Sequence, residues 1–198
     1  MASLCRLHGG AVRCLSIAAF GAAIAFALGS YATAQQNDPD RKCAVLVFEG
    51  QFGHIEVCVS SILPAQKGNR YGPEQVFDGD PATAWVEGAP EDGRGQWIEY
   101  LFEWPMRLQS FEILAGYAKS RKAHQNNARP KDVRVFADGE FIETIRLEDT
   151  MSVQRVTLSE PVEAEFFRLE IASSYRGNKW QDLAVSEFYV DLEELNYQ

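Results

Sequence analysis

The sequence lacks the short motifs that mark the common catalytic sites. It contains no HExxH zinc motif, no CxxC pair, no serine nucleophile motif and no glycine-rich loop of the kind that cradles phosphates. Histidine, the most frequent general acid–base residue, occurs only three times in 198 residues. Scattered carboxylates could form a glycosidase pair, but nothing in the sequence identifies one. These absences favour a binding protein and leave a small hydrolase as the less favoured alternative.

Positive charge is scarce as well. The chain has 19 Lys and Arg against 28 Asp and Glu, and its formal net charge is −9. Phosphate contacts made by cations dominate the affinity of proteins for nucleic acids, so this balance argues against a nucleic-acid partner. An acidic surface suits a soluble protein that works outside the cytoplasm.

An apolar run of membrane-spanning length is also missing. The run Cys14–Leu28 has about 15 residues, whereas a spanning helix needs about 20. It follows Arg6 and Arg13 and precedes Ala32-Thr33-Ala34, the small-x-small pattern of a cleavage site. Residues 1–34 are therefore predicted to be a secretory signal peptide, with an uncleaved anchor as the alternative. The prediction implies a secreted or periplasmic protein with no stable membrane span after cleavage.

Only four cysteines are present, and two of them, Cys5 and Cys14, would leave with the leader. Cys43 and Cys58 remain as an even pair in an oxidising compartment, which predicts a disulfide. They flank two apolar runs separated by a glycine-rich turn, the pattern of a β-hairpin with the bridge near its open end. Two free buried thiols are the alternative; a metal site is less favoured because His54 is the only histidine nearby.

Helix signals are scarce, whereas short segments of strand character recur. Residues 35–42 are polar and predict a flexible tether, and residues 43–198 predict one domain that begins with the hairpin. Alternation with a period of two indicates strands with one buried face. Asp138-Gly139, between two such strands, predicts a tight hairpin turn. The fold class is therefore all-β, an antiparallel sandwich or barrel. The expected strands are 96–102, 111–117, 132–136, 141–147, 153–158, 167–171 and 185–190.

Three longer segments interrupt the strand pattern: residues 63–95, 118–131 and 173–183. Long irregular loops on a β-sandwich are where function usually lies. The first segment places Asp78, Asp80 and Thr83 around Gly and Pro, and calcium takes oxygen ligands in such turns. Composition alone favours the alternative that these side chains only hydrogen-bond the turn.

The other two segments combine aromatic rings, planar amides and cations. No acid occurs between Glu112 and Asp132, a local reversal of sign in an acidic chain. Rings can stack on the apolar face of a sugar, Asn and Arg can pair with hydroxyls, and cations can attract an anionic sugar or a phosphate. An ordinary solvated loop, with Trp180 as a core cap, is the alternative. The candidate ligand-binding residues are Tyr117, Lys119, Asn126, Asn127, Arg129, Tyr175, Arg176 and Trp180.

The order and spacing of several motifs resemble the discoidin-like domains (coagulation factor 5/8 type C). The longer match is to the bacterial subgroup named after the glycan-binding domain of streptococcal NAD-glycohydrolase, and it covers nearly all of the chain from Ser61 onward. The motifs that carry it are Tyr71-Gly72-Pro73, Phe77-Asp78-Gly79-Asp80-Pro81-Ala82-Thr83-Ala84-Trp85, Gly95-Gln96-Trp97, Gly116-Tyr117-Ala118-Lys119-Ser120, Asn126-Asn127-Ala128-Arg129-Pro130-Lys131 and Tyr175-Arg176-Gly177 with Trp180-Gln181-Asp182 and Ser186-Glu187-Phe188.

The resemblance implies a galactose-binding-like fold, an eight-stranded antiparallel β-sandwich (jelly roll) that binds a glycan through loops at one end. Many such domains hold a structural calcium ion, here at Asp78, Asp80, Thr83 and Glu187. The Cys43–Cys58 hairpin precedes the matched region, and NAD-glycohydrolase activity is not implied because no such domain is present. A sandwich that docks an envelope or extracellular protein through the same loops is the second hypothesis.

Overall fold

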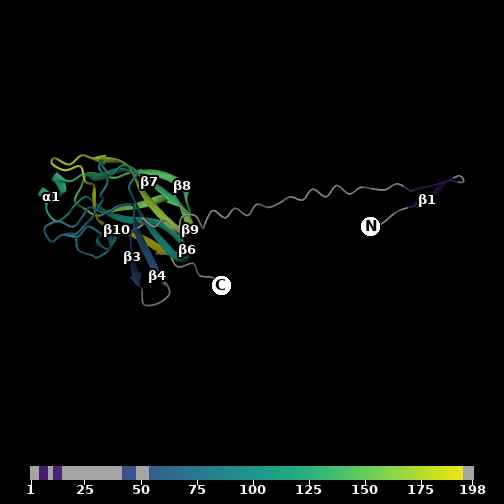
Figure 1. Cartoon of the computed structure of the whole chain (residues 1–198), viewed down its shortest axis with the longest axis horizontal. Helices are drawn as coiled ribbons and strands as arrows, with labels where there is room; N and C mark the ends of the chain where they lie inside the picture. Colours follow the sequence, from purple (N-terminus) through teal and green to yellow (C-terminus); the bar gives the residue numbers. More distant parts are fainter. Residues whose placement is uncertain (1–4, 9–10, 15–41, 48–53, 194–198) are drawn as a thin grey trace. The chain divides into compact units, whose positions relative to one another are not determined.

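The structure, a computed structural model, describes residues 5–8, 11–14, 42–47 and 54–193 (Figure 1). The chain divides into two units, Met1–Gln36 and Asn37–Gln198. The first unit contains an antiparallel pair, β1 (Cys5–His8) and β2 (Ala11–Cys14). The predicted apolar run and cleavage site of the leader lie outside the described residues, as do nearly all of the tether and the tip of the hairpin. In the described part, no helix is long and apolar enough to cross a membrane.

The second unit is built from β-strands, with one short helix and one 3-10 turn. Its named strands all pair antiparallel, in the order β3-β4-β6-β9-β7-β8, and β10 pairs with β5 and β6. The elements are β3 (Lys42–Val47), β4 (His54–Val59), η1 (Pro73–Val76), β5 (Trp85–Val86), β6 (Trp97–Ala115), α1 (Arg121–Asn126), β7 (Arg129–Ala137), β8 (Glu140–Arg146), β9 (Gln154–Tyr175) and β10 (Ala184–Glu193).

The two longest strands, β6 and β9, change surroundings along their length. The first half of β6 pairs with β4 and the second half with β10, while β9 runs beside both halves. The β6–β9 register shifts between Leu101 and Met106 and again between Leu108 and Ser110. Bulges of this kind bend a strand and increase its twist, so β6 and β9 take part in both faces of the sandwich. The predicted antiparallel β-sandwich is confirmed.

Aromatic side chains fill the middle of the sandwich. Phe188 on β10 lies 5.5 Å from Phe111 and 5.4 Å from Tyr100, measured between ring centroids, and Phe167 packs beside them. Each such buried ring contributes about 2 kcal/mol or more of hydrophobic stabilisation. The Tyr100 hydroxyl donates a hydrogen bond to the Phe188 carbonyl, which satisfies the one polar group of the cluster.

Some strands in the structure are longer than the sequence predicted, because two predicted strands belong to one continuous strand. The predicted strands 96–102 and 111–117 are the two ends of β6, and the predicted strands 153–158 and 167–171 both lie in β9. Pro105 and Pro161 fall at the register shifts, where a ladder hydrogen bond is already missing, so the strands continue through them. The Asp138-Gly139 hairpin is confirmed, with φ of 48° and 84° at the two turn residues.

The predicted disulfide is also present. Cys43 and Cys58 lie directly opposite each other in the β3–β4 hairpin, and their sulfurs are bonded. Because β4 also pairs with β6, the hairpin extends the edge of the main sheet. The bridge therefore fastens the edge strand β3 to β4, whose Ile55, Val57 and Val59 side chains are buried in the core.

Replacing both cysteines in Cys43→Ala/Cys58→Ala should lower the free energy of unfolding by about 3 kcal/mol, because a 15-residue loop regains its freedom in the unfolded chain. Denaturant titration of the oxidised proteins measures the difference. Reductant should bring the unaltered protein to the stability of the variant and leave the variant unchanged. Equal stability of the two oxidised proteins would contradict the prediction.

Candidate functional site

A pocket of about 440 Å³ lies where three connections of the sandwich meet. The connections are the loop between β4 and β5, the segment between β6 and β7 that contains α1, and the loop between β9 and β10. The residues that line it are Leu63, Gln66, Lys67, Asn69, Tyr71, Tyr117, Lys119, Ser120, Lys122, Ala123, Asn126, Asn127, Trp180 and Asp182.

Backbone hydrogen bonds fix the β9–β10 loop against the segment that follows α1. The amide of Trp180 donates to the carbonyl of Asn126 at 2.8 Å, and the amide of Ala128 donates to the carbonyl of Asp182 at 3.1 Å. Gly177 makes this approach possible, because a Cβ there would collide with the carbonyl oxygens of Asn126 and Trp180. Two walls of the pocket are therefore joined through the main chain, which preorganises them.

The helix between β6 and β7 is short and begins at a clear cap. The Ser120 hydroxyl accepts a hydrogen bond from the amide of Ala123, which is the usual N-cap contact. The sequence predicted a loop here because a helix of six residues is too short to show periodicity. The turn of helix presents Ala123, Asn126 and Lys122 to the pocket.

Three aromatic side chains contribute to the lining. Tyr71 and Tyr117 are both 8% exposed and contact each other edge to face, with ring centroids 6.5 Å apart. Burial raises the pKa of the Tyr117 hydroxyl, and the nearby Tyr71 and Asp80 add to the effect. Trp180 is 42% exposed, and the amino group of Lys179 lies 4.5 Å from its ring centroid. Trp180 is the most exposed of the three rings that line the pocket.

Five of the eight predicted ligand residues come together in this pocket: Tyr117, Lys119, Asn126, Asn127 and Trp180. The amino group of Lys119 donates to the side-chain carbonyl of Asn69 at 3.1 Å, and the amide nitrogen of Asn127 donates to the Ala123 carbonyl at 2.9 Å. These contacts orient the two side chains before any ligand binds.

Sequence reasoning missed the wall that the β4–β5 loop supplies. Gln66, Lys67, Asn69 and Tyr71 line the pocket from a segment more than 40 residues away from Tyr117 in sequence. The amide of Val86 donates to the carbonyl of Tyr71 at 3.4 Å, and this contact with β5 helps to place the loop. The sequence pointed to this region through the long irregular segment 63–95 and the Tyr71-Gly72-Pro73 motif, but not to these individual side chains.

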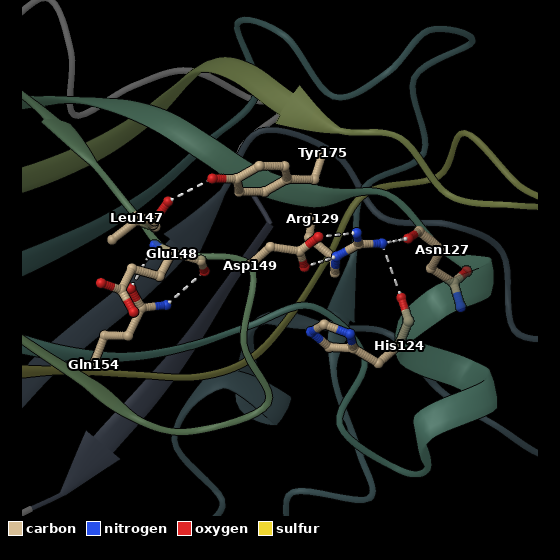
Figure 2. Close-up of polar contacts among 8 residues, drawn as sticks. All are labelled: His124, Asn127, Arg129, Leu147, Glu148, Asp149, Gln154 and Tyr175. Carbon is tan, nitrogen blue, oxygen red and sulfur yellow. Dashed lines mark hydrogen bonds and ion pairs between the residues drawn. The ribbon is translucent and has the colours of Figure 1, made fainter.

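Arg129 lies outside the pocket and has a structural role (Figure 2). Its Nε and Nη2 atoms each donate to the Asp149 carboxylate at 2.7 Å, and Nη1 donates to the carbonyls of His124 and Asn127 at 3.1 and 3.0 Å. The residue is only 8% exposed. A guanidinium with all of these bonds made has little left to offer a ligand, so its predicted ligand role is replaced by support of the α1 segment.

Tyr175 and Arg176 also lie apart from the pocket lining. The Tyr175 hydroxyl donates to the Leu147 carbonyl at 3.0 Å, and its ring lies 5.9 Å from the Arg129 guanidinium and 5.7 Å from the Lys131 amino group (Figure 2). Tyr175 thus packs on the support network. Arg176 is exposed and is not among the residues that line the pocket.

A second cavity of about 400 Å³ lies next to this network, lined by residues that include His124, Arg129 and Asp149. His124 is 6% exposed, and its Nε2 atom has no hydrogen-bond partner within the described part of the chain. Burial lowers the pKa of His124, and the positive charge of Arg129 lowers it further. Both effects favour the neutral form of this imidazole, which belongs to α1 itself.

The predicted calcium residues form a turn and one buried acid beside it. The Thr83 hydroxyl lies 2.8 Å from Oδ2 of Asp78, to which it donates, and the Asp80 amide donates to Oδ1 of Asp78 at 2.9 Å. Glu187 is 5% exposed; its Oε2 accepts from the Tyr189 hydroxyl at 2.7 Å, and its Oε1 is buried with no partner among the described residues.

The charge environment of Glu187 suits a cation. Burial raises the pKa of its carboxyl group, and the charges of Asp78 and Asp80 raise it further. An unpaired buried carboxylate oxygen next to two further carboxylates is a donor set that calcium accepts. Within the described residues, however, the one tight group of potential metal-ligating side chains is Cys43, Glu56 and Cys58, whose sulfurs are already bonded to each other. The donor types at Glu187 therefore fit calcium, although the carboxylate oxygens are not gathered in the present arrangement.

Comparison with known proteins defines the family. The chain belongs to the NAD glycohydrolase translocation F5/8 type C domain family, whose model matches residues 48–191. This match begins within the disulfide-bonded hairpin and confirms the resemblance to discoidin-like domains. A search of curated proteins gave no match.

Solved structures with this fold include carbohydrate-binding modules of family 32. One from Clostridium perfringens, in complex with GalNAc-β-1,3-galactose, has a TM-score of 0.54 at 18% identity, and the match covers 69% of this chain and 94% of that one. The NanJ module of C. perfringens, in complex with galactose, has a TM-score of 0.52 at 16% identity over 69% and 92% of the two chains. The EndoD module of Streptococcus pneumoniae has a TM-score of 0.51 at 17% identity over 69% and 96%. These likenesses establish the galactose-binding-like fold.

The support role of Arg129 can be separated from the pocket by stability. Arg129→Gln should lower the free energy of unfolding by about 2 kcal/mol or more, because Asp149 and two carbonyl oxygens lose a charged donor. Lys119→Gln, on the pocket wall, should change it by less than about 0.5 kcal/mol. Thermal and denaturant unfolding of both variants measure the effects; equal effects would contradict the assignment.

Proposed function

We propose that this chain is a non-catalytic carbohydrate-binding module whose ligand occupies the pocket between the three loops. The observation that carries the proposal is the exposed side chain of Trp180 at a pocket that is also lined by Asn126 and Gln66, whose side chains end in planar amides. A sugar ring offers one apolar C–H face for stacking and hydroxyls for amide groups, and this lining provides both.

The organisation of the pocket favours binding of a rigid polar ligand. Its walls are held by main-chain hydrogen bonds, and the Tyr71–Tyr117 pair is fixed by burial. A preformed site avoids the entropy cost of ordering loops and side chains on binding. A volume of about 440 Å³ lies within the range of small-ligand sites.

The relatives support the same proposal. The family 32 modules with this fold include one in complex with GalNAc-β-1,3-galactose and one in complex with galactose. At identities of 16% and 18%, the choice of binding residues has to come from this chain itself. The disulfide suits an oxidising compartment, so we propose that the domain acts outside the cytoplasm.

The lining does not favour hydrolysis of the glycan. Asp182 is the one acid among the lining residues that the structure describes, whereas glycoside hydrolysis by the usual mechanism uses two carboxylates across the scissile bond. Binding without cleavage is therefore the function that the pocket supports.

Glycan array screening of the protein, followed by calorimetry with the best ligand, tests the proposal. Trp180→Ala should weaken binding by about tenfold or more, because the stacking surface is removed. Trp104→Ala is the matched control, since Trp104 is similarly exposed at 37% but lies on β6 outside the pocket. Absence of binding to every glycan would overturn the proposal. Capture of an envelope protein that survives both Trp180→Ala and Tyr117→Ala would place a protein contact elsewhere.

We also propose that Glu187, with Asp78, Asp80 and Thr83, takes up a calcium ion that stabilises the domain. The support is the unpaired buried Oε1 of Glu187 beside two negative side chains. Because burial raises the pKa of Glu187, its charge costs stability at neutral pH, and the cost disappears as the pH falls through the raised pKa. A bound cation would remove the same cost.

Calcium should therefore raise the melting temperature of the unaltered protein at neutral pH. Glu187→Gln should raise the melting temperature of the chelated protein, because the buried charge is gone, and should abolish the response to calcium. Differential scanning calorimetry with chelator or calcium measures both effects. An unchanged melting temperature on chelation, together with metal analysis that finds no calcium, would leave the Asp residues as turn residues only.

A further inference from the structure

The charges around the pocket oppose those of the chain as a whole. Its lining contains three lysines, Lys67, Lys119 and Lys122, and a single acid, Asp182, although the formal net charge of the chain is −9. The three lysines come from two different connections of the sandwich, so the local excess of positive charge is not the product of one basic run.

Lys67 lies at a turn position with a left-handed backbone conformation, which residues other than lysine usually occupy. Gln66 and Asn69 exchange both backbone hydrogen bonds, at 3.2 and 2.9 Å, so that Lys67 and Gly68 are the two residues of a tight turn. Both have positive φ, 51° at Lys67 and 83° at Gly68. Such turns prefer Asn, Asp or Gly at the first of these positions.

Another tight turn of this chain has a residue that is usual at the first turn position. The tight turn between β7 and β8 has Asp138 at the equivalent position, with a φ of 48°. Lysine has no short side chain to compensate for a left-handed backbone, so Lys67 costs conformational energy that Asn or Asp would reduce. The position of Lys67 in the pocket lining is a reason for the presence of lysine here.

The other two lysines differ in their surroundings. Lys119 is held by the turn that contains Lys67, whereas Lys122 lies where a positive charge does not favour the helix. The Lys119 amino group donates to the Asn69 side chain at 3.1 Å, and Asn69 closes the Lys67 turn. Lys122 lies in the first turn of α1, which contains no acid, although helix starts favour acids. Packing does not explain the positions of these exposed cations.

We infer that the pocket selects a glycan bearing an acidic group, a carboxylate or a sulfate ester, and that Lys67, Lys119 and Lys122 recognise that group. The inference rests on the glycan-binding function proposed above. Ammonium groups act as point charges without the planar fork of arginine, so they provide charge selection for either acid. Asp182 remains available to accept hydrogen bonds from neutral hydroxyls.

Matched pairs of sugars test the inference by calorimetry: galactose with galacturonic acid, and lactose with 3′-sialyllactose and lactose 3′-sulfate. The acidic member should bind about tenfold or more tightly, and the difference should shrink between about 50 and 500 mM NaCl because salt screens exposed charges. The variant Lys67→Gln/Lys119→Gln/Lys122→Gln should lose the preference, measured as the ratio of the affinities for the acidic and the neutral member of each pair. The control Lys42→Gln/Arg94→Gln/Arg155→Gln removes the same charge outside the pocket lining and should retain the preference.

The outcomes separate the two proposals. Neutral sugars bound as tightly as acidic ones, or a preference that survives the triple lysine variant, would overturn the acidic-glycan inference and leave glycan binding intact. Failure of every sugar, neutral and acidic, would overturn both.

A single change offers an independent readout. Lys67→Asn should raise the melting temperature, because Asn suits the left-handed turn position, while weakening binding of the acidic sugar about threefold. Unchanged affinity for the acidic sugar would show that Lys67 has no part in recognition.

Discussion

The guanidinium of Arg129 fixes the segment on which the pocket depends. It lies at the start of β7, pairs with Asp149, and reaches the carbonyls of His124 and Asn127 at the end of α1. Carbonyls at a helix C-terminus have no partner within the helix, and a cation there satisfies them. Since the Asn126 carbonyl in turn receives the amide of Trp180, the position of the exposed ring depends on this buried charge through the Asn127 carbonyl and the backbone hydrogen bond from Trp180 to Asn126.

A second contact connects the pocket to the acidic turn. The buried hydroxyl of Ser186 on β10 donates to the Thr83 carbonyl at 2.8 Å and accepts the amide of Ala118 at 3.0 Å. Thr83 belongs to the turn of Asp78 and Asp80, and Ala118 follows the pocket residue Tyr117. A cation that rigidified this turn would thus act on the pocket wall through one side chain, without touching the ligand.

The strands and the Asp138-Gly139 turn could be predicted because each depends on residues that are adjacent in the sequence. The disulfide could be predicted because only two cysteines, Cys43 and Cys58, follow the predicted signal peptide. The continuity of β6 and β9 was not predictable in this way, since Pro105 and Pro161 are tolerated only because bulges coincide with them. The separation of the predicted ligand residues into pocket residues and structural residues also depends on contacts between segments that are distant in the sequence. Arg129 and Lys119 look equivalent in a basic segment, and only the distant Asp149 makes one structural and leaves the other at the pocket.

This division shows how the chain uses cations in two ways within one short segment. Arg129 is almost fully buried, and its bidentate bond to Asp149 exploits the planar fork that lysine lacks. The pocket lysines are exposed, and Lys67 lies at a left-handed backbone position that lysine occupies at a conformational cost. A buried guanidinium with all its partners stabilises the fold, whereas exposed ammonium groups contribute little stability there and are free to recognise charge. Recognition of an acidic ligand, as proposed above, would account for the conformational cost at Lys67.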